Sequence, residues 1–205
     1  MIVLLANYKP GVAKTTSAAY LLAALHERGE QVIGVDADLS RGLQRWADAA
    51  EFPMPVLSMA SPQLHTNLPP LVPAGAHVVI DGPQAEDHPG IVVSAARIAD
   101  VVLVPLAPSA AELERTLVMR KLLVDDVSPL RPDGAVPFRA LLNRVVANAS
   151  STGQVREVLQ GEGWDVCTTT IPRREEYAGA WGNPITARGT AYDALVTELG
   201  IGARG

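Results

Sequence analysis

A short segment near the start of the chain, residues 9–16, constrains the fold more than any other feature of the sequence. It reads Lys-Pro-Gly-Val-Ala-Lys-Thr-Thr and lies between an apolar run, Ile2–Ala6, and an Ala/Leu-rich segment typical of a helix, Ser17–Leu25. A strand, a tight turn and a helix N-terminus bring free backbone N–H groups and the positive end of a helix dipole to one point. The segment therefore predicts a phosphate-binding loop.

The lysines of the chain support this interpretation. Only three are present, Lys9, Lys14 and Lys121, against fourteen arginines, and two of the three lie in this loop. A compact ammonium suits a point contact with phosphate, so we expect Lys14 to meet the β- and γ-phosphates and the Thr15 hydroxyl to bind Mg²⁺. The other nucleotide contacts expected from the loop are Gly11, Val12, Ala13 and Thr16.

Two residues depart from the general pattern of such loops. Ala13 stands where glycine usually precedes the lysine, and Pro10 has no N–H to donate. The extra methyl group of Ala13 is compatible with the loop if its φ is negative. Taken alone, the segment also allows an ordinary turn between a strand and a helix.

Length and composition indicate a single soluble domain over residues 1–205, because the chain is 48% hydrophobic and contains no linker-like stretch. It has no apolar run of membrane-spanning length and no basic leader, so we expect a cytoplasmic protein. A single cysteine, Cys167, excludes an internal disulfide and Cys-x-x-Cys metal sites. The net charge of −5 means that any contact with DNA must be local.

Apolar runs of strand length alternate with helical patterns along the chain, which predicts the α/β class: a doubly wound, mostly parallel sheet with helices on both faces. A Pro-rich stretch, Pro53–Pro73, is expected to form an irregular connection around a short strand and a weak helix. The predicted strands are Ile2–Ala6, Gln31–Val35, His77–Ile80, Val101–Pro105, Phe138–Leu142 and Val166–Ile171. The predicted helices are Thr16–Arg28, Arg41–Ala50, Gly90–Ala99, Ala110–Val127, Thr152–Gln160 and Ala187–Leu199.

Three aspartates follow two of these strands. Asp36 and Asp38 come after the second strand, and Asp81 ends the strand that begins at His77. Ligands of such sheets bind beyond the carboxyl ends of the strands, so we expect these carboxylates beside the loop, where Mg²⁺ and an attacking water are needed. An aspartate at a strand end is also often a helix cap, and this role is open for each of them alone.

Together these motifs resemble those of the ParA/MinD-type ATPases, the deviant Walker group of the P-loop NTPases. The specific match is a second lysine, Lys9, five residues before Lys14, followed by Asp36-x-Asp38, Asp81-Gly82 and the segment 104–109. The short length and the position of Trp46 are most similar to the small, ParF-like partition ATPases. The sequence departs from the family at Pro10, Ala13 and Leu39-Ser40, so a weak or inactive ATPase is the alternative.

The resemblance implies ATP and Mg²⁺ as ligands and an ATP-dependent homodimer. Lys9 would reach across to the nucleotide of the partner subunit, Asp38 would orient the attacking water, and Asp36 and Asp81 would act on Mg²⁺ with Thr15. A solvated surface lysine is the alternative for Lys9.

In the same family, the adenine lies near the residues that correspond to Asn143, Pro172 and Arg173. A turn-forming asparagine is an equally good interpretation of Asn143. Arg173, Arg174, Arg188 and Arg204 are candidates for DNA contacts, although exposed arginines more often form a solvated face.

The function implied is DNA partition: an ATP dimer binds nonspecific DNA on the nucleoid, and a ParB-like partner stimulates hydrolysis and releases it. Membrane anchoring is not expected, since the C-terminal residues are too short and Gly-rich for an amphipathic helix. Two alternatives stay open. One is a positioning ATPase for a protein cargo, and the other is a metabolic P-loop ligase or kinase.

Overall fold

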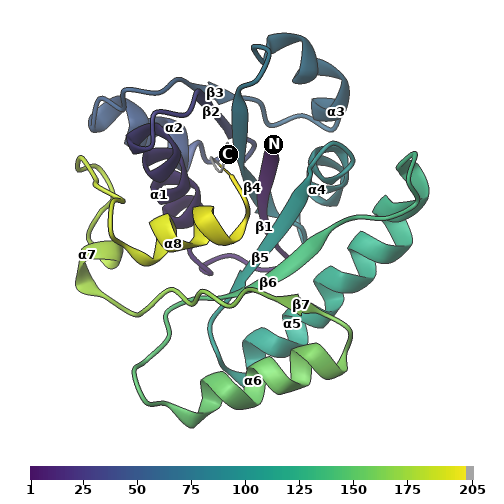
Figure 1. Cartoon of the computed structure of the whole chain (residues 1–205). Coiled ribbons are helices and arrows are strands. Elements are labelled where there is room, and N and C mark those ends of the chain that lie inside the picture. Colours follow the sequence, from purple (N-terminus) through teal and green to yellow (C-terminus); the bar gives the residue numbers. More distant parts are fainter. Residues whose placement is uncertain (202–205) are drawn as a thin grey trace.

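The computed structural model describes residues 1–201, and Arg204 lies outside the described residues. Its centre is a seven-stranded sheet in the order β3-β2-β4-β1-β5-β6-β7, in which every pair is parallel (Figure 1). The doubly wound α/β prediction is therefore confirmed, and the sheet is parallel throughout. The strands are β1 (Ile2–Asn7), β2 (Val32–Asp36), β3 (Val56–Ser58), β4 (His77–Gln84), β5 (Val101–Leu106), β6 (Phe138–Leu142) and β7 (Asp165–Val166).

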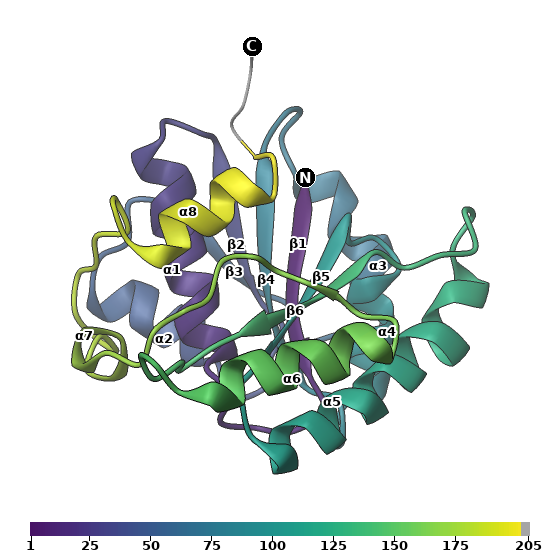
Figure 2. The ribbon, with the colours of Figure 1, turned by 60° about the horizontal axis from the view of Figure 1, so that its bottom comes forward.

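Helices cover both faces of the sheet, because alternate apolar side chains of each strand point to opposite sides. One buried cluster joins β1 to α1, α2 and α8, and the other joins it to α3, α4, α5 and α6 (Figures 1 and 2). The α-helices are α1 (Lys14–Glu27), α2 (Gly42–Ala49), α3 (Leu64–Asn67), α4 (Pro89–Ala96), α5 (Ala110–Lys121), α6 (Ser150–Gly161), α7 (Glu175–Ala178) and α8 (Ala191–Glu198). Short 3₁₀ turns lie at Pro69–Leu71 and Ser128–Leu130, and a π-helical segment, Leu122–Val127, continues α5.

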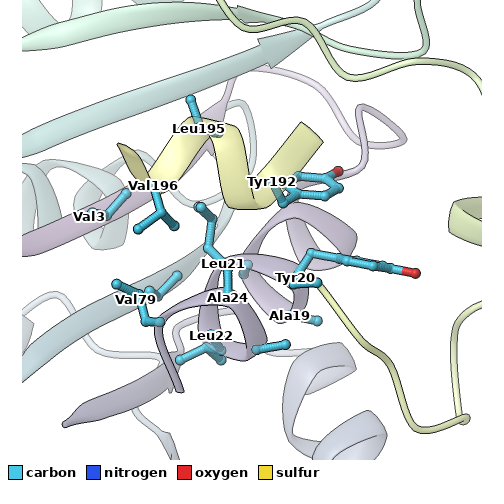
Figure 3. Close-up of a cluster of buried hydrophobic side chains, with 14 of the residues drawn as sticks. Val3, Ala19, Tyr20, Leu21, Leu22, Ala24, Val79, Tyr192, Leu195 and Val196 are labelled. Atoms are coloured by element: carbon cyan, nitrogen blue, oxygen red, sulfur yellow. The ribbon is translucent and has the colours of Figure 1, made fainter. Parts of the chain in front are cut away.

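Helix α1 is enclosed by its neighbours, which explains why its sequence is apolar on nearly all sides. Leu21 is buried near α8 and Leu22 is buried against Gly34 of β2, while Tyr20 stacks on Tyr192 with ring centroids 5.0 Å apart (Figure 3). Val196 of α8 packs in the same cluster. The last helix of the chain thus anchors the helix that follows the phosphate loop.

The strand predicted at Val166–Ile171 is wrong beyond its first residue, since β7 ends at Val166. The backbone N–H groups of Thr168 and Thr169 donate to the carboxylate of Glu198, each at 2.7 Å, and therefore do not bond to the neighbouring strand β6. The sheet resumes contact with the chain at Ile171, whose N–H donates to Leu142 O at 2.9 Å.

The helix predicted at Ala187–Leu199 begins four residues later than expected. The N–H groups of Ala187 and Arg188 donate to the carboxylate of Glu27, and Gly189 has a φ of 75°, so this segment forms a turn. Strand β4 is longer than predicted and includes Asp81. Within residues 1–201, no helix combines the length and the hydrophobicity needed to cross a bilayer.

Candidate functional site

The phosphate loop connects the carboxyl end of β1 to the N-terminus of α1 at the centre of the sheet, between β4 and β5. Strand order reverses at β1, which is where ligands of doubly wound sheets bind. Gly11 and Ala13 both have a left-handed backbone, with φ values of 79° and 64°. The expectation of a negative φ at Ala13 is therefore wrong. An alanine occupies a glycine conformation there, at a cost of about 1 kcal/mol.

Lys14 is the first residue of α1, and its side chain is mostly buried, with 8% of the residue exposed. Burial lowers the pKa of this ammonium, whereas the nearby carboxylates of Asp81 and Asp38 raise it. A desolvated ammonium gains more from an anionic ligand than an exposed one does, because charge interactions are stronger away from water.

Asp81 lies inside β4, paired in register with Leu5 of β1 on one side and with Asp36 of β2 on the other. It is 1% exposed, and within residues 1–201 neither carboxylate oxygen has a hydrogen-bond partner. Burial raises the pKa of Asp81 to about 7, and the charges of Asp36 and Asp38 act in the same direction, against the Thr15 hydroxyl and Lys14.

Such an unpartnered carboxylate beside a threonine hydroxyl fits Mg²⁺, which prefers hard oxygen ligands. Across residues 1–201, no three His, Cys, Asp or Glu side chains are arranged to hold a metal ion by themselves. A cation held at Asp81 and Thr15 would therefore take most of its ligands from phosphate oxygens and water.

Asp36 is fully buried at the end of β2, and burial raises its pKa. Its carboxylate accepts the N–H of Gln44 at 2.8 Å and the N–H of Asp38 at 3.1 Å. Both oxygens thus hold the segment between β2 and α2. The capping role that the sequence left open for Asp36 is present in the structure.

Asp38 follows β2 in the segment that leads to α2, and one of its oxygens accepts the N–H of Ser40 at 2.8 Å. This segment touches the phosphate loop: a Cβ atom at Gly42 would lie 3.7 Å from the Thr15 hydroxyl oxygen. Arg41, which precedes α2, has a φ of 53°. Asp38 thus lies in a segment that reaches Thr15 through Gly42, and its charge acts on Lys14 and Asp81.

An open cavity of about 560 Å³ extends from Ala13 and Thr16 across the carboxyl ends of β5 and β6 to the segment 172–178. Its walls include Asn143, Pro172 and Arg173, the three residues expected near a base. Asn143 is 3% exposed, and its side chain accepts the N–H of Arg144 at 2.7 Å. The asparagine is thus both a wall of the cavity and a turn former.

The cavity wall is tied to α8 by a buried polar chain. The amide nitrogen of Asn143 donates to the Ser17 hydroxyl at 3.4 Å, and that hydroxyl lies 3.2 Å from the hydroxyl of Tyr192. Sequence reasoning missed Ser17, Tyr192 and Tyr177, which also lines the cavity. Ser17 and Tyr192 lie in helical patterns typical of the core, and no motif surrounds Tyr177, so no sequence signal marked them.

Two of the candidate DNA arginines already have contacts within the chain. Arg173 and Arg174 line the cavity, and Arg174 pairs with Glu176 at 3.2 Å. Arg188 donates to the carbonyl oxygen of Glu27 at 3.0 Å, at the other end of α1. Arg188 also lines a second hollow together with Glu176, the ion-pair partner of Arg174, so it lies near that pair.

Lys9 contacts Glu86 of the same chain, with 2.6 Å between Lys9 Nζ and Glu86 Oε1. Glu86 follows β4 and was not predicted from the sequence. No motif distinguishes Glu86 from its neighbour Asp87, so only the folded chain identifies the pair.

A scan against family models matches residues 3–185 to the CobQ/CobB/MinD/ParA nucleotide binding domain. A search of curated protein sequences finds no significant match.

Solved structures of similar fold include cobyrinic acid a,c-diamide synthase from Mycobacterium smegmatis with ADP and magnesium, at 20% identity and a TM-score of 0.75, covering 97% of this chain and 93% of that one. McdA from Cyanothece in complex with ATP is 16% identical, with a TM-score of 0.72 and coverages of 98% and 96%. A protein from Borrelia burgdorferi B31 described as a plasmid partition protein, bound to AMPPNP, is 17% identical, with a TM-score of 0.73 and coverages of 97% and 97%. At these identities the likeness concerns the fold.

Proposed function

The chain belongs to the CobQ/CobB/MinD/ParA nucleotide-binding domain family, and on that premise we propose that it is a ParA-like ATPase that uses ATP and Mg²⁺ to partition DNA. The observation that carries ATP and Mg²⁺ is the buried Asp81 carboxylate, which has no hydrogen-bond partner in residues 1–201 and lies beside Thr15 and Lys14. The Mycobacterium smegmatis and Borrelia burgdorferi proteins bind ADP with magnesium and AMPPNP, respectively, which supports this choice.

In this proposal, the residues of the loop divide the work of phosphoryl transfer. Lys14 neutralises charge on the β- and γ-phosphates, and the backbone of residues 11–16 binds their oxygens. Thr15 and Asp81 hold Mg²⁺, which when bound would neutralise phosphate charge; Asp36 supports them through water. Asp38 orients the attacking water; the action of its charge on Lys14 supports this role.

The base of the nucleotide occupies the cavity lined by Asn143, Pro172 and Arg173. Asn143 keeps its side chain in the hydrogen bonds to Arg144 and Ser17, so we assign it mainly the role of shaping the cavity wall. The 205 residues act as one ATPase domain.

Lys9 acts in trans, so that two subunits form an ATP-bound homodimer. The dimer binds nonspecific DNA, and a ParB-like partner stimulates hydrolysis and releases it into the cytoplasm. Arg173 and Arg174 at the mouth of the cavity are the DNA contacts that we favour. Arg188, which is bound to Glu27, is the weaker candidate.

The test is binding to random-sequence duplex DNA with ATP, ADP or no nucleotide, over a salt series. We expect tight binding with ATP alone, falling steeply as salt rises because phosphate contacts release counterions. Reversal of charge in Arg173→Glu/Arg174→Glu should abolish this binding, with fluorescent-ATP binding measured in parallel. Arg115→Glu, on the opposite face of the sheet, is the control. Unchanged DNA affinity would remove the arginine pair from the proposal.

Two other functions have support among the structures of similar fold. One is a positioning ATPase for a protein cargo, since McdA has a similar fold and binds ATP. The other is a metabolic ligase, since cobyrinic acid a,c-diamide synthase has a similar fold. ATP hydrolysis without DNA binding in any nucleotide state would favour one of these two. Absence of hydrolysis and of nucleotide binding would mean that Pro10 and Ala13 have inactivated the loop.

A further inference from the structure

Lys9 and Glu86 lie together because the backbone segments that carry them are bonded to each other. The N–H of Ala85 donates to Asn7 O at 3.0 Å, and the N–H of Glu86 donates to Tyr8 O at 3.1 Å. These bonds extend the contact between β1 and β4 past the ends of both strands. The Glu86 carboxylate is therefore held within reach of Lys9.

The ion pair itself is close but only partly shielded from water. The Lys9 Nζ atom is 2.6 Å from one Glu86 oxygen and 2.5 Å from the other, while the side chains are 32% and 39% exposed. Pairs of this kind are weak and sensitive to salt. The contact is thus strong enough to direct Lys9 and weak enough to exchange for another anion.

We propose that Glu86 is the positioning residue of Lys9: it holds the ammonium in its own subunit and so opposes its transfer to the nucleotide of a second copy. This inference rests on the proposed ATP-dependent dimer. A lysine carries one compact charge, so pairing with Glu86 and pairing with a phosphate across the dimer exclude each other. Dimerisation then proceeds only as far as the phosphate outcompetes Glu86.

The test compares dimerisation of the wild type and Glu86→Gln with AMPPNP and Mg²⁺, by sedimentation velocity over a range of protein concentrations. We expect Glu86→Gln to dimerise at a concentration about two- to fivefold lower, which is the range that the loss of an exposed ion pair produces. Glu86→Asp, which keeps the charge, should restore most of the wild-type behaviour. The difference should shrink at high salt.

Two controls separate positioning from a general effect on structure. Asp125→Asn removes the acidic partner of Lys121, the exposed pair on the far side of the molecule, and should leave dimerisation unchanged. In a Lys9→Ala background, Glu86→Gln should have no further effect, because Glu86 acts through Lys9.

The outcomes distinguish this inference from the proposed function. The role of Glu86 is wrong, and the dimer stands, if the wild type dimerises through Lys9 and Glu86→Gln dimerises at the same concentration. The same holds if Glu86→Gln changes dimerisation in the Lys9→Ala background. If the wild type binds AMPPNP and stays monomeric, both the dimer and the role of Glu86 are wrong.

Discussion

Ala13 and Asp81 show that single residues at this site are held in unfavourable states. Ala13 has the left-handed backbone of a glycine, and Asp81 is a buried carboxylate without a hydrogen-bond partner among residues 1–201. Strain and unpaired charge of this kind are found where a ligand compensates for them. At Asp81 the compensation can be measured directly.

Asp81→Asn should stabilise the nucleotide-free protein above neutral pH and should abolish Mg²⁺-dependent nucleotide binding. The pKa of Asp81 in the fold is about 7, above the ordinary 3.8, so the folded state binds the proton more tightly than the unfolded state. The carboxylate therefore lowers the stability of the fold progressively as pH rises from about 4 to about 7, and little further above 7. At pH 8 we expect the free energy of unfolding in urea to be about 1–3 kcal/mol higher for the variant than for the wild type. This difference should become smaller below pH 6. If the stability difference between the variant and the wild type were the same at pH 6 and pH 8, a buried and ionising Asp81 would be contradicted.

At the scale of elements, the site depends on how α8 is joined to α1. Tyr192 is fully buried on α8, stacks on Tyr20, and its hydroxyl lies 3.2 Å from the hydroxyl of Ser17 in the first turn of α1. Desolvation raises the pKa of Tyr192, so the phenol stays protonated and can donate to Ser17. A helix from the end of the chain thereby supports the cavity beside the loop.

Two substitutions of Tyr192 should separate the contribution of its hydrogen bond from the contribution of its packing. Tyr192→Phe loses one buried hydrogen bond, about 1 kcal/mol, whereas Tyr192→Ala also leaves a cavity and should cost about 3–5 kcal/mol. Tyr177→Phe is the matched control, since the Tyr177 hydroxyl is buried without a hydrogen-bond partner in the described residues, and it should be neutral or stabilising. Chemical unfolding of the three variants measures this. A larger loss in Tyr177→Phe than in Tyr192→Phe would contradict the assigned hydrogen bond.

At the scale of the whole molecule, the parallel sheet brings residues from across the sequence to one edge. Asp38 follows β2, Asp81 lies within β4 and Asn143 follows β6. Strand β1, between β4 and β5, leads into the loop that carries Lys14. A ligand that bridges the phosphate loop and the cavity would connect both halves of the sheet. Its binding should therefore stabilise the entire fold.

We expect saturating ATP with Mg²⁺ to raise the melting temperature substantially. A ligand at one hundred times its Kd adds about 2.7 kcal/mol, which corresponds to about 5–10 °C in a chain of this size. Removal of Mg²⁺ with EDTA should reduce the shift, and Lys14→Ala should abolish it; Lys121→Ala is the control. Thermal unfolding followed by circular dichroism gives the measurement. A full shift in Lys14→Ala would place the nucleotide elsewhere.

The local sequence pattern was sufficient to predict the features that depend on residues close together in the sequence. The strand, loop and helix around Lys14 follow from residues 2–25, and the position of Asp36 at the end of β2 follows from an apolar run. Asp81 was expected to end its strand, but β4 continues to Gln84. The extent of β7 and the start of α8 could not be predicted in this way. Both depend on carboxylates distant in sequence, Glu198 and Glu27, that capture backbone N–H groups.

The sequence by itself determined the α/β class, the phosphate loop and the aspartates beside it, because periodicity and loop chemistry act over a few residues. Only the tertiary structure decided the φ of Ala13, the pairing of Lys9 with Glu86 and the link from Asn143 through Ser17 to Tyr192. The two side-chain links depend on contacts between residues 77 to 175 positions apart. The φ of Ala13 depends on how the loop leaves the packed strand β1. No local pattern encodes them, since the same side chains would be free to point elsewhere until the sheet and helices had packed.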